Sequence, residues 1–449
     1  MKPLYLGIDI GTTKVSVAVV SADLSAHAAE SCDHRAGLPR QEGCFEQDFA
    51  LIEAAVERAL GRMPPDILNR VESVGITCQM HSVLLGRNNG EVSPCVTWQD
   101  RRAEDEVAQM RTESECDLYP GYGAVTLSFF ARRGLLEGWD WAGTPGDEMG
   151  RRLTGASSIR FIEPSLAVPW GIYDHASRRW KSSAAEALGI PLRFLPQIVP
   201  AGKEIGKTSG GFGGIPDGLP VFAAIGDNQA SVIGSGGDPS SDLFVTVGTG
   251  SQLSAVVSEA EAAVVKPVSG LDFRPFPGNG ILVAVPPLSG GKAWSLAGDF
   301  FSGIIRQFGG LPPTENEMLD RLSDLAATAA PDAGGLIIEP DFFGTRVTPG
   351  KFGVISGITA TNFTLPNIAR ALAQGIVRNL FAPMPKEILA TKTRLVGSGN
   401  GLGKCGAVRA AVQDACPLPL VMPRRREEAA TGAALYAARM YARLYRETA

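Results

Sequence analysis

The chain has 449 residues, which is too long for one hydrophobic core and fits two domains of roughly 200 residues each. Its net charge of −5 argues against non-specific binding to nucleic acid, because such binding needs a basic face that displaces counterions from phosphates. No apolar run reaches the length of a membrane span, and the first residues lack the regions of a signal peptide. We therefore expect a cytoplasmic protein with neither a nucleic-acid nor a membrane partner.

The first elements predict an α/β start with a mixed sheet. A strand over 5–9 leads through a Gly-Thr-Thr turn at 11–13 into a second strand over 14–20. Apolar residues at helical spacing predict a helix over 49–60, and the run 71–77 predicts a buried strand. Strand, strand, helix, strand is the order of an α/β domain.

Residues 101–215 interrupt this pattern with helical pieces and Gly and Pro turns, and the sheet pattern resumes over 219–227. A helix is expected from Asn228 onward, and the polar, glycine-rich stretch 235–241 is typical of a linker. We therefore predict an N-terminal domain over 1–236 and a C-terminal domain over 237–449.

The second half repeats the order of the first. A Gly-Thr-Gly hairpin at 248–250 is followed by a strand over 281–285 and by a strong helix over 365–381. A strand over 394–396 then leads into a glycine loop at 397–401, and the chain closes with a helix from about 427 to 445. The seven cysteines are scattered without a Cys-x-x-Cys pair, and we expect free thiols and no metal site built from cysteine and histidine.

Two turns, one at Gly11-Thr12-Thr13 and one at Gly248-Thr249, follow β-rich runs in the two halves. Such a turn offers backbone N–H groups and hydroxyls without a bulky side chain, which suits phosphate oxygens. One Gly-Thr hairpin by itself is more often only a turn. The pair favours two domains of one kind that share a nucleotide.

Two carboxylates stand near these turns at the ends of predicted strands. Asp9 cannot bind phosphate directly, since like charges repel, but it can hold Mg²⁺ that lies between; its alternative role is to cap the turn. Asp227 precedes a helix that it could simply cap. Because ligands of open α/β sheets bind at the carboxyl ends of strands, we favour a functional role for Asp227.

Five motifs in chain order resemble those of the FGGY carbohydrate kinases, and the resemblance covers essentially the whole chain. They are Asp9-Ile10-Gly11-Thr12-Thr13, Gly226-Asp227-Asn228-Gln229-Ala230, Gly248-Thr249-Gly250, Gly397-Ser398-Gly399 and Glu428-Ala429-Ala430-Thr431-Gly432-Ala433-Ala434. This family consists of ATP-dependent sugar kinases of the actin, Hsp70 and hexokinase superfamily. The resemblance implies an α/β fold with two ribonuclease-H-like domains around a central cleft.

The resemblance also implies roles for individual residues. ATP and Mg²⁺ are the implied cofactors, with Asp9 on the metal and Asp227 as the general base. The residues expected at the nucleotide are Gly11, Thr12, Thr13, Gly248, Thr249, Gly290, Gly291, Gly397 and Gly399. Of these, Thr12, Thr13 and Thr249 would meet the transferred phosphate, and Gly397 and Gly399 would let the adenosine approach the backbone.

Within the family, several segments look most like those of the sedoheptulokinases. The residues expected at the sugar are Gln79, Met80, His81, Trp98, Asp227 and Asn228. Trp98 and Trp170 could equally be core aromatics, His81 could be a core histidine, and Asp100 with Arg101 is more often an exposed pair. The chain departs from the family pattern at 145–147 and 165–169, which affects the expected sugar contacts rather than the fold or the reaction.

Together with the two phosphate turns and Asp227, the resemblance implies ATP-dependent phosphorylation of a ketose hydroxyl, with sedoheptulose converted to sedoheptulose 7-phosphate as the leading reaction. One alternative is a xylulokinase-like enzyme that acts on a five-carbon ketose. Another is a non-catalytic nucleotide-binding sugar sensor, which ranks lower because Asp227 is present and no helix-turn-helix precedes the first strand. The expected partners are a small-molecule sugar and ATP, and a homodimer is left open.

Overall fold

The structure is a computed structural model that describes residues 2–39, 41–248, 250–266, 268, 270–287, 290–344, 350–423 and 427–446. The chain divides into two compact units, one of Met1–Gly236 with Arg425–Ala449 and one of Gly237–Arg424. Within the described residues no helix is long and apolar enough to span a membrane. All seven cysteines are free thiols, as the sequence predicts.

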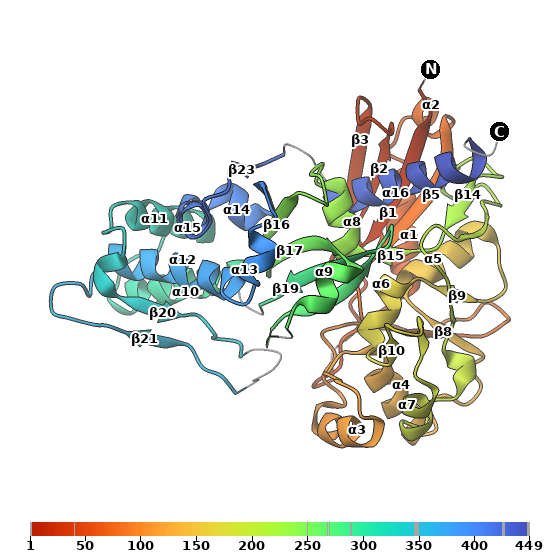
Figure 1. Ribbon diagram of the computed structural model, residues 1–449, viewed down its shortest axis with the longest axis horizontal. Coiled ribbons are helices and arrows are strands. Elements are labelled where there is room, and N and C mark those ends of the chain that lie inside the picture. Colours follow the sequence, from red (N-terminus) through yellow and green to blue (C-terminus); the bar gives the residue numbers. More distant parts are fainter. Residues whose placement is uncertain are drawn as a thin grey trace. The chain divides into compact units, whose positions relative to one another are not determined.

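The first unit is built on a seven-stranded mixed sheet in the order β13-β14-β5-β1-β2-β3, with β15 also paired to β5 (Figure 1). Its strands are β1 (Leu4–Ile10), β2 (Lys14–Val20), β3 (His27–Asp33), β5 (Val71–Cys78), β13 (Glu204–Lys207), β14 (Pro220–Phe222) and β15 (Ile225–Gly226). β1 runs antiparallel to β2 and parallel to β5, which in turn runs parallel to β14 and β15. The predicted strands over 5–9, 14–20 and 71–77 are confirmed.

Helices cover both faces of this sheet. Helix α1 (Phe49–Leu60) has the predicted bounds and begins where the Asp48 side chain accepts a hydrogen bond from the backbone N–H of Ala50. Helix α5 (Pro145–Thr154) packs on the face that carries Ile76 and Cys78, since Gly150 and Gly146 approach those side chains. Side chains alternate along a strand, so Gly75 lies on the opposite face.

That opposite face is covered by α8 (Asp227–Gly234) and the C-terminal helix α16 (Glu428–Tyr445), which lies across the first strands in Figure 1. The contact is backbone to backbone. A Cβ added to Gly7, Gly75, Gly234 or Gly432 would stand 1.9, 2.1, 1.9 or 1.7 Å from the carbonyl oxygen of Ala430, Ala433, Glu428 or Ala230, respectively. Glycine is required at each of these positions by the close approach.

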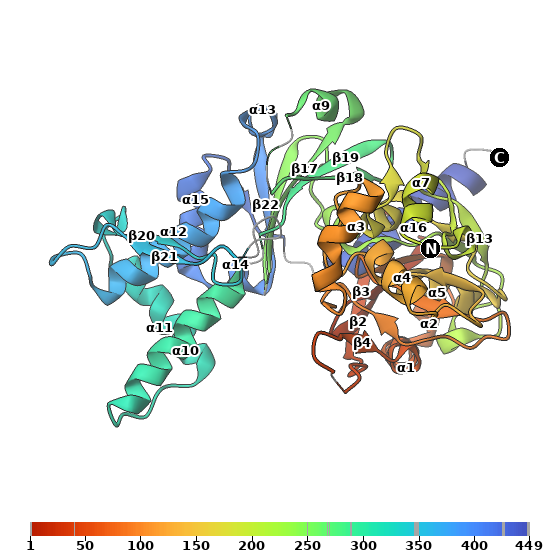
Figure 2. The ribbon, with the colours of Figure 1, turned by 90° about the horizontal axis from the view of Figure 1, so that it is seen from below.

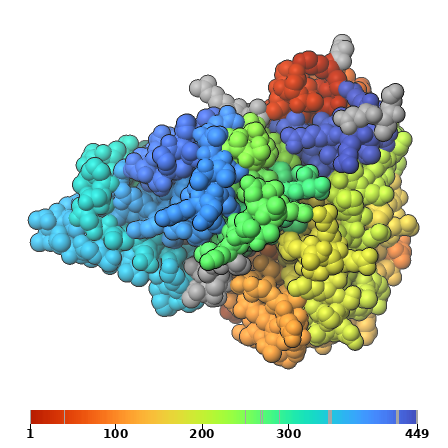
Figure 3. Space-filling model, viewed as in Figure 1, coloured from red at the N-terminus to blue at the C-terminus, as the bar shows by residue number. Residues whose placement is uncertain are grey.

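The position of α16 corrects the predicted domain assignment, which gave all of 237–449 to the second domain. Residues 425–449 belong to the first unit, because the small side chains of α16 fit the glycines of β1, β5 and α8. In the space-filling view the C-terminal segment lies directly against the first strands (Figure 3). The chain therefore leaves the first unit after Gly236 and returns to it.

The second unit has a six-stranded sheet in the order β18-β19-β17-β16-β22-β23. Its strands are β16 (Asp242–Val247), β17 (Ser251–Ser258), β18 (Asp272–Phe276), β19 (Gly280–Val285), β22 (Arg394–Ser398) and β23 (Leu420–Val421). β16 and β17 form the predicted hairpin, and β22 and β23 run parallel to β16. The sequence β19-β17-β16-β22-β23 thus repeats the order and directions of β3-β2-β1-β5-β14.

Helix α12 (Leu365–Phe381) packs on β17, and α10 (Gly291–Gln307), α11 (Glu315–Ala327) and α15 (Gly406–Ala415) pack against α12 (Figure 2). The predicted helix over 365–381 is confirmed with the same bounds. The predicted glycine loop over 397–401 is wrong in extent: β22 continues to Ser398, and a helix, α14 (Asn400–Lys404), follows at once. Only Gly399, with φ +89°, makes the turn between them.

The packing of α16 makes a testable prediction for stability. Gly432→Ala places a methyl group onto the carbonyl of Ala230, so the free energy of unfolding of the first unit should fall by about 3 kcal/mol. Thermal denaturation should show a Tm lower by about 5–10 °C. Gly37→Ala is the matched control, since a Cβ at Gly37 meets nothing within 4 Å. Equal Tm values for the two variants would contradict the packing described.

Candidate functional site

The carboxyl ends of three neighbouring strands bring the two predicted carboxylates together. In the parallel register, Cys78 of β5 pairs with Ile10 of β1 on one side and with Gly226 of β15 on the other. Asp9 therefore lies one residue before the end of its strand, and Asp227 one residue after the end of β15. The side chains at this edge come from segments that are far apart in the sequence, at the position where open α/β sheets bind ligands.

The surroundings of the Asp9 side chain are unusual for a carboxylate. Its Oδ1 atom is buried and has no hydrogen-bond partner among the described residues. Burial raises the pKa of the Asp9 carboxyl well above its usual range, and the negative charges of Asp227 and Glu427 raise it further, against the opposing effect of Lys14. A cation at Oδ1 would satisfy the lone pair and offset the repulsion.

Asp9 fits a hard cation such as Mg²⁺, which takes oxygen ligands from one or two carboxylates together with phosphates and water. Among the residues that the structure describes, no three His, Cys, Asp or Glu side chains gather into a metal site. A metal at Asp9 would therefore draw the rest of its ligands from a bound phosphate and from water.

Asp227 is the first residue of α8 and is half-buried. The N-cap position of this helix is taken by Gly226, which has no side chain, so Asp227 is not the N-cap residue. Its place in the first turn is favourable for a negative charge, because the helix dipole is positive there. The Asp227 carboxylate thus lies at the same edge of the sheet as Asp9.

Gln79 and Trp98 are tied to the first Gly-Thr turn by a closed set of hydrogen bonds. Thr12 Oγ1 donates to Gln79 Oε1 over 3.1 Å and accepts from Trp98 Nε1 over 3.0 Å. Gln79 Nε2 donates to Gln47 Oε1 over 2.7 Å, and Gln47 Nε2 donates to the Thr12 carbonyl over 2.7 Å. Trp98 is 41% exposed, so its core alternative is wrong.

Gln47 joins the candidate site through these bonds and was not assigned to it by the sequence analysis. It lies in the two-residue strand β4 (Glu46–Gln47) just before α1. The one signal for it is that a polar side chain is buried at this position. The amide fixes both Gln79 and the turn, and so it orders a surface that would present donors and acceptors to a polyol.

His81 stands in a strained backbone conformation. Its φ of +70° lies in the left-handed region that a residue with a side chain rarely adopts, and such strain gathers at functional sites. Its ring Nδ1 lies 3.0 Å from the carbonyl of Pro169, so Nδ1 carries the proton and donates. The ring lies 4.8 Å, centre to centre, from that of Tyr122.

The other predicted residues of the first unit are distributed around the same edge. Met80 is buried, with its sulfur 3.2 Å from where a Cβ of Gly226 would lie. Gly11 closes its turn by donating its N–H to the Lys14 carbonyl over 3.0 Å, and Thr13 is exposed. Asn228 follows Asp227 in α8 and is half-buried.

In the second unit the structure brings Gly248 and the start of α10 together. The Gly291 N–H donates to the Gly248 carbonyl over 2.9 Å, and a Cβ on Gly290 would collide with Gly250. The N-terminus of α10, which favours anions, therefore lies beside the turn. Thr249, which the sequence analysis also assigns to the nucleotide, lies outside the described residues.

Gly399 and Gly397 differ in their surroundings. Gly399 approaches the carboxyl end of β16, where its Cβ would stand 2.5 Å from the Val247 carbonyl. Gly397 is buried in β22, and the side chains of Met422 and Leu402 fill the space beside it. Gly397 therefore makes room for packed side chains, whereas Gly399 lies at the carboxyl end of β16.

The two segments that depart from the family pattern, 145–147 and 165–169, form ordered helical turns in the first unit. Residues 145–147 start α5 with a capping box between Thr144 and the buried Asp147. Residues 165–169 form a short helix and a turn that lead to Trp170, which is fully buried against Trp180 and is therefore a core aromatic.

Asp100 is part of a structural ion pair. It is buried, pairs with Arg102 at 2.8 Å and accepts a hydrogen bond from the Phe45 N–H. The expectation of an exposed Asp100–Arg101 pair is therefore wrong, because the carboxylate turns inward to Arg102, one residue further on.

Comparison with known proteins gives a consistent result. The model for the FGGY family of carbohydrate kinases, N-terminal domain, matches residues 4–234. Sedoheptulokinase of Mus musculus is 28% identical over 469 residues and covers 97% of both chains. Glycerol kinase of Alkalilimnicola ehrlichii is 26% identical over 472 residues, covering 97% of this chain and 89% of the relative.

A solved structure of ligand-bound xylulose kinase from Lactobacillus acidophilus superposes with a TM-score of 0.81 at 21% identity, covering 99% of this chain and 90% of that one. The likeness confirms the expected fold, α/β with two ribonuclease-H-like domains. The shared strand order of the two units agrees with it.

Asp147 makes a prediction for the dependence of stability on pH. Burial raises the pKa of its carboxyl from 3.8 to about 7, so between these values the folded state binds a proton that the unfolded state has lost. The contribution of Asp147 to stability is therefore greatest below about pH 4 and is lost as the pH rises to about 7.

Asp147→Asn keeps an oxygen for the Thr144 hydrogen bonds and carries no charge. Urea unfolding between pH 5 and 8 should show a smaller loss of unfolding free energy for this variant than for the wild type. A loss as steep as that of the wild type would contradict the assignment.

Proposed function

The chain belongs to the FGGY family of carbohydrate kinases and is a carbohydrate kinase, and we propose that its reaction is the phosphorylation of sedoheptulose by ATP to sedoheptulose 7-phosphate. The observation that carries the proposal is the pair of carboxylates, Asp9 and Asp227, at the ends of β1 and β15, the strands on either side of β5, beside the Gly11–Thr13 turn. Phosphoryl transfer needs one carboxylate for the metal and one for the acceptor hydroxyl.

Asp227 acts as the general base in this proposal. A carboxylate is too weak to ionise a sugar hydroxyl in the ground state. The transition state of phosphoryl transfer is loose, however, so the base chiefly orients the hydroxyl and takes its proton late. The half-buried position of Asp227 at the start of α8 allows its oxygens to reach a sugar at the sheet edge.

Asp9 would hold Mg²⁺, directly or through water, as its unpartnered buried Oδ1 supports. When bound, the metal neutralises charge on the phosphates. Thr12 and Thr13 offer hydroxyls, and Gly11 gives the turn its open backbone. In the second unit, Gly248, Gly291 and Gly399 present backbone near the end of β16, which suits the phosphates and ribose of ATP.

The sugar itself is proposed to lie against Gln79, His81 and Trp98. Their amide, imidazole and indole groups are ordered by the bonds to Thr12 and to the Pro169 carbonyl, so they are oriented before the sugar arrives. A heptulose is favoured over a pentulose by the similarity to sedoheptulokinase along nearly the whole chain. The likeness to xylulose kinase concerns the fold alone, and the pentulose remains the second candidate.

The decisive experiment is a coupled assay with ATP and Mg²⁺ on sedoheptulose, xylulose and glycerol. We expect the highest kcat/KM with sedoheptulose, and Asp227→Asn should lower kcat by about 10²- to 10⁴-fold while calorimetry still detects sugar binding. The matched control is Asp66→Asn, which alters an exposed aspartate in the first turn of α2 (Pro65–Leu68).

Near-wild-type activity of Asp227→Asn would overturn its assignment as the base. A higher kcat/KM for xylulose or glycerol would overturn the proposed substrate.

Asp9→Asn tests the metal. The variant buries one negative charge fewer near Asp227, so in metal-free buffer it should melt at a higher temperature than the wild type. Its half-saturating Mg²⁺ concentration in the assay should rise by about 10-fold or more. An unchanged Mg²⁺ requirement would show that Asp9 does not serve the metal.

A further inference from the structure

Gly226, the residue before the proposed base Asp227, is held by a side chain that has no role in the proposed reaction. Strand β15 has only two residues, Ile225 and Gly226, and α8 begins directly after it with Asp227. A strand this short has few ladder hydrogen bonds, so the direction in which Asp227 leaves the sheet depends on other anchors.

Two buried hydroxyls supply these anchors. Thr77 Oγ1, from β5, donates to the Ile225 carbonyl over 2.9 Å. On the other side, the Gly226 N–H donates to Ser165 Oγ over 2.8 Å. Thr77 and Ser165 are both fully buried, so water does not compete for either bond.

Ser165 is itself oriented by a buried carboxylate. Its hydroxyl has one proton, which it donates to Glu163 Oε2, and this leaves a lone pair for the Gly226 N–H. The Ser165 backbone N–H donates to the same Oε2 atom over 2.7 Å. Two bonds between Glu163 and Ser165 therefore fix where the serine oxygen stands.

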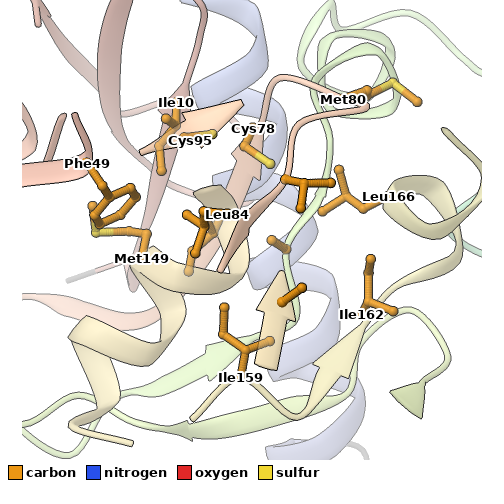
Figure 4. Packing of buried hydrophobic residues seen from close by; sticks show 14 of the residues in the cluster. Ile10, Phe49, Cys78, Met80, Leu84, Cys95, Met149, Ile159, Ile162 and Leu166 are labelled. Carbon is orange, nitrogen blue, oxygen red and sulfur yellow. The ribbon is translucent and has the colours of Figure 1, made fainter. Parts of the chain in front are cut away.

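The segment that carries this pair is fixed in the core. Helix α6 (Pro164–Ala167) follows strand β9 (Phe161–Ile162), and Figure 4 shows Leu166 and Ile162 pointing into the same cluster as Cys78 of β5. Glu163 is 2% exposed. The support behind Gly226 is thus rigid, as positioning of a reacting group requires.

We propose that Ser165, held in place by Glu163, is a positioning residue that anchors the Gly226 amide and so sets the direction of the Asp227 carboxylate. The proposal rests on the function of Asp227 as the base. It also gives a role to part of the 165–169 segment, which departs from the family pattern and which the sequence analysis linked only to the sugar pocket. Displacement of a reacting group by about 1 Å can cost about 100-fold in rate.

The test is a set of serine variants in the full chain. Ser165→Ala removes the acceptor for the Gly226 N–H and should lower kcat by about 10- to 100-fold, while the KM for the sugar changes by less than about 3-fold. Ser165→Thr keeps the hydroxyl and should recover most of kcat. Glu163→Gln keeps an acceptor for the serine hydroxyl and should fall between the two.

Ser128→Ala is the matched control. Ser128 is also fully buried in the first unit and also makes a hydrogen bond, from its Oγ to the Leu188 carbonyl over 2.8 Å, but it does not touch β15. If Ser165 were only structural, both alanine variants would lower the Tm alike and leave the kcat of the folded enzyme alike. We expect kcat to fall only in Ser165→Ala.

Hydrogen exchange gives a readout that does not depend on activity. In Ser165→Ala the Gly226 amide should exchange at least about 10-fold faster than in the wild type, and in Ser128→Ala it should not. Unchanged kcat and unchanged exchange in folded Ser165→Ala would overturn the proposal.

Asp227→Asn, assayed in parallel, separates this proposal from the proposed function. If Asp227→Asn is inactive and Ser165→Ala retains the wild-type kcat, the positioning role fails and the base assignment stands. If Asp227→Asn is fully active, the base assignment fails, and the positioning role fails with it.

Discussion

The close backbone contact of α16 with β1, β5 and α8 is the constraint on which the rest of the first unit depends. At four positions a glycine faces a carbonyl oxygen, and no other residue fits. β1 contains Asp9 and α8 begins with Asp227, so one helix fixes the elements that carry both carboxylates. Because α16 comes from the end of the chain, the site is complete only when residues 428–445 have packed against the first strands.

The edge of this sheet that carries the candidate site is strained both electrostatically and in its backbone. Burial raises the pKa of Asp9, and the charge of Asp227 raises it further. His81, immediately after the Gln79–Met80 pair, has a left-handed backbone. Such features lower the stability of the folded state, and the packing of the hydrophobic core of the first unit offsets this loss (Figure 4). A cation bound at Asp9 would relieve the repulsion between these carboxylates.

The two units share one strand order but carry different groups at equivalent places. Counting back from the Gly-Thr turns, Asp9 in β1 corresponds to Thr246 in β16. Thr246 Oγ1 lies 2.8 Å from Ser398 Oγ, so the second unit presents neutral hydroxyls where the first presents a carboxylate. The duplication therefore provides two frameworks, and among the residues that the structure describes the first has Asp9 and Asp227 near its turn where the second has the Thr246 and Ser398 hydroxyls.

The sequence by itself determined the local elements and the motifs. α1 and α12 have their predicted bounds because apolar residues recur at the helical period, and the turns after β1 and β16 follow from Gly-Thr between β-rich runs. The order of the motifs was enough to identify the family and the fold. These features depend on residues close together in the chain, and so the sequence pattern records them.

Only the tertiary structure decided which segments meet. It assigned α16 to the first unit, closed the Thr12–Gln79–Gln47 bonds, turned Asp100 to Arg102, and placed Ser165 under Gly226. Most of these contacts join residues that are tens to hundreds of positions apart, and each partner taken alone is an ordinary polar or small residue. Their selection depends on the register of neighbouring strands and on burial, which no local pattern in the sequence specifies.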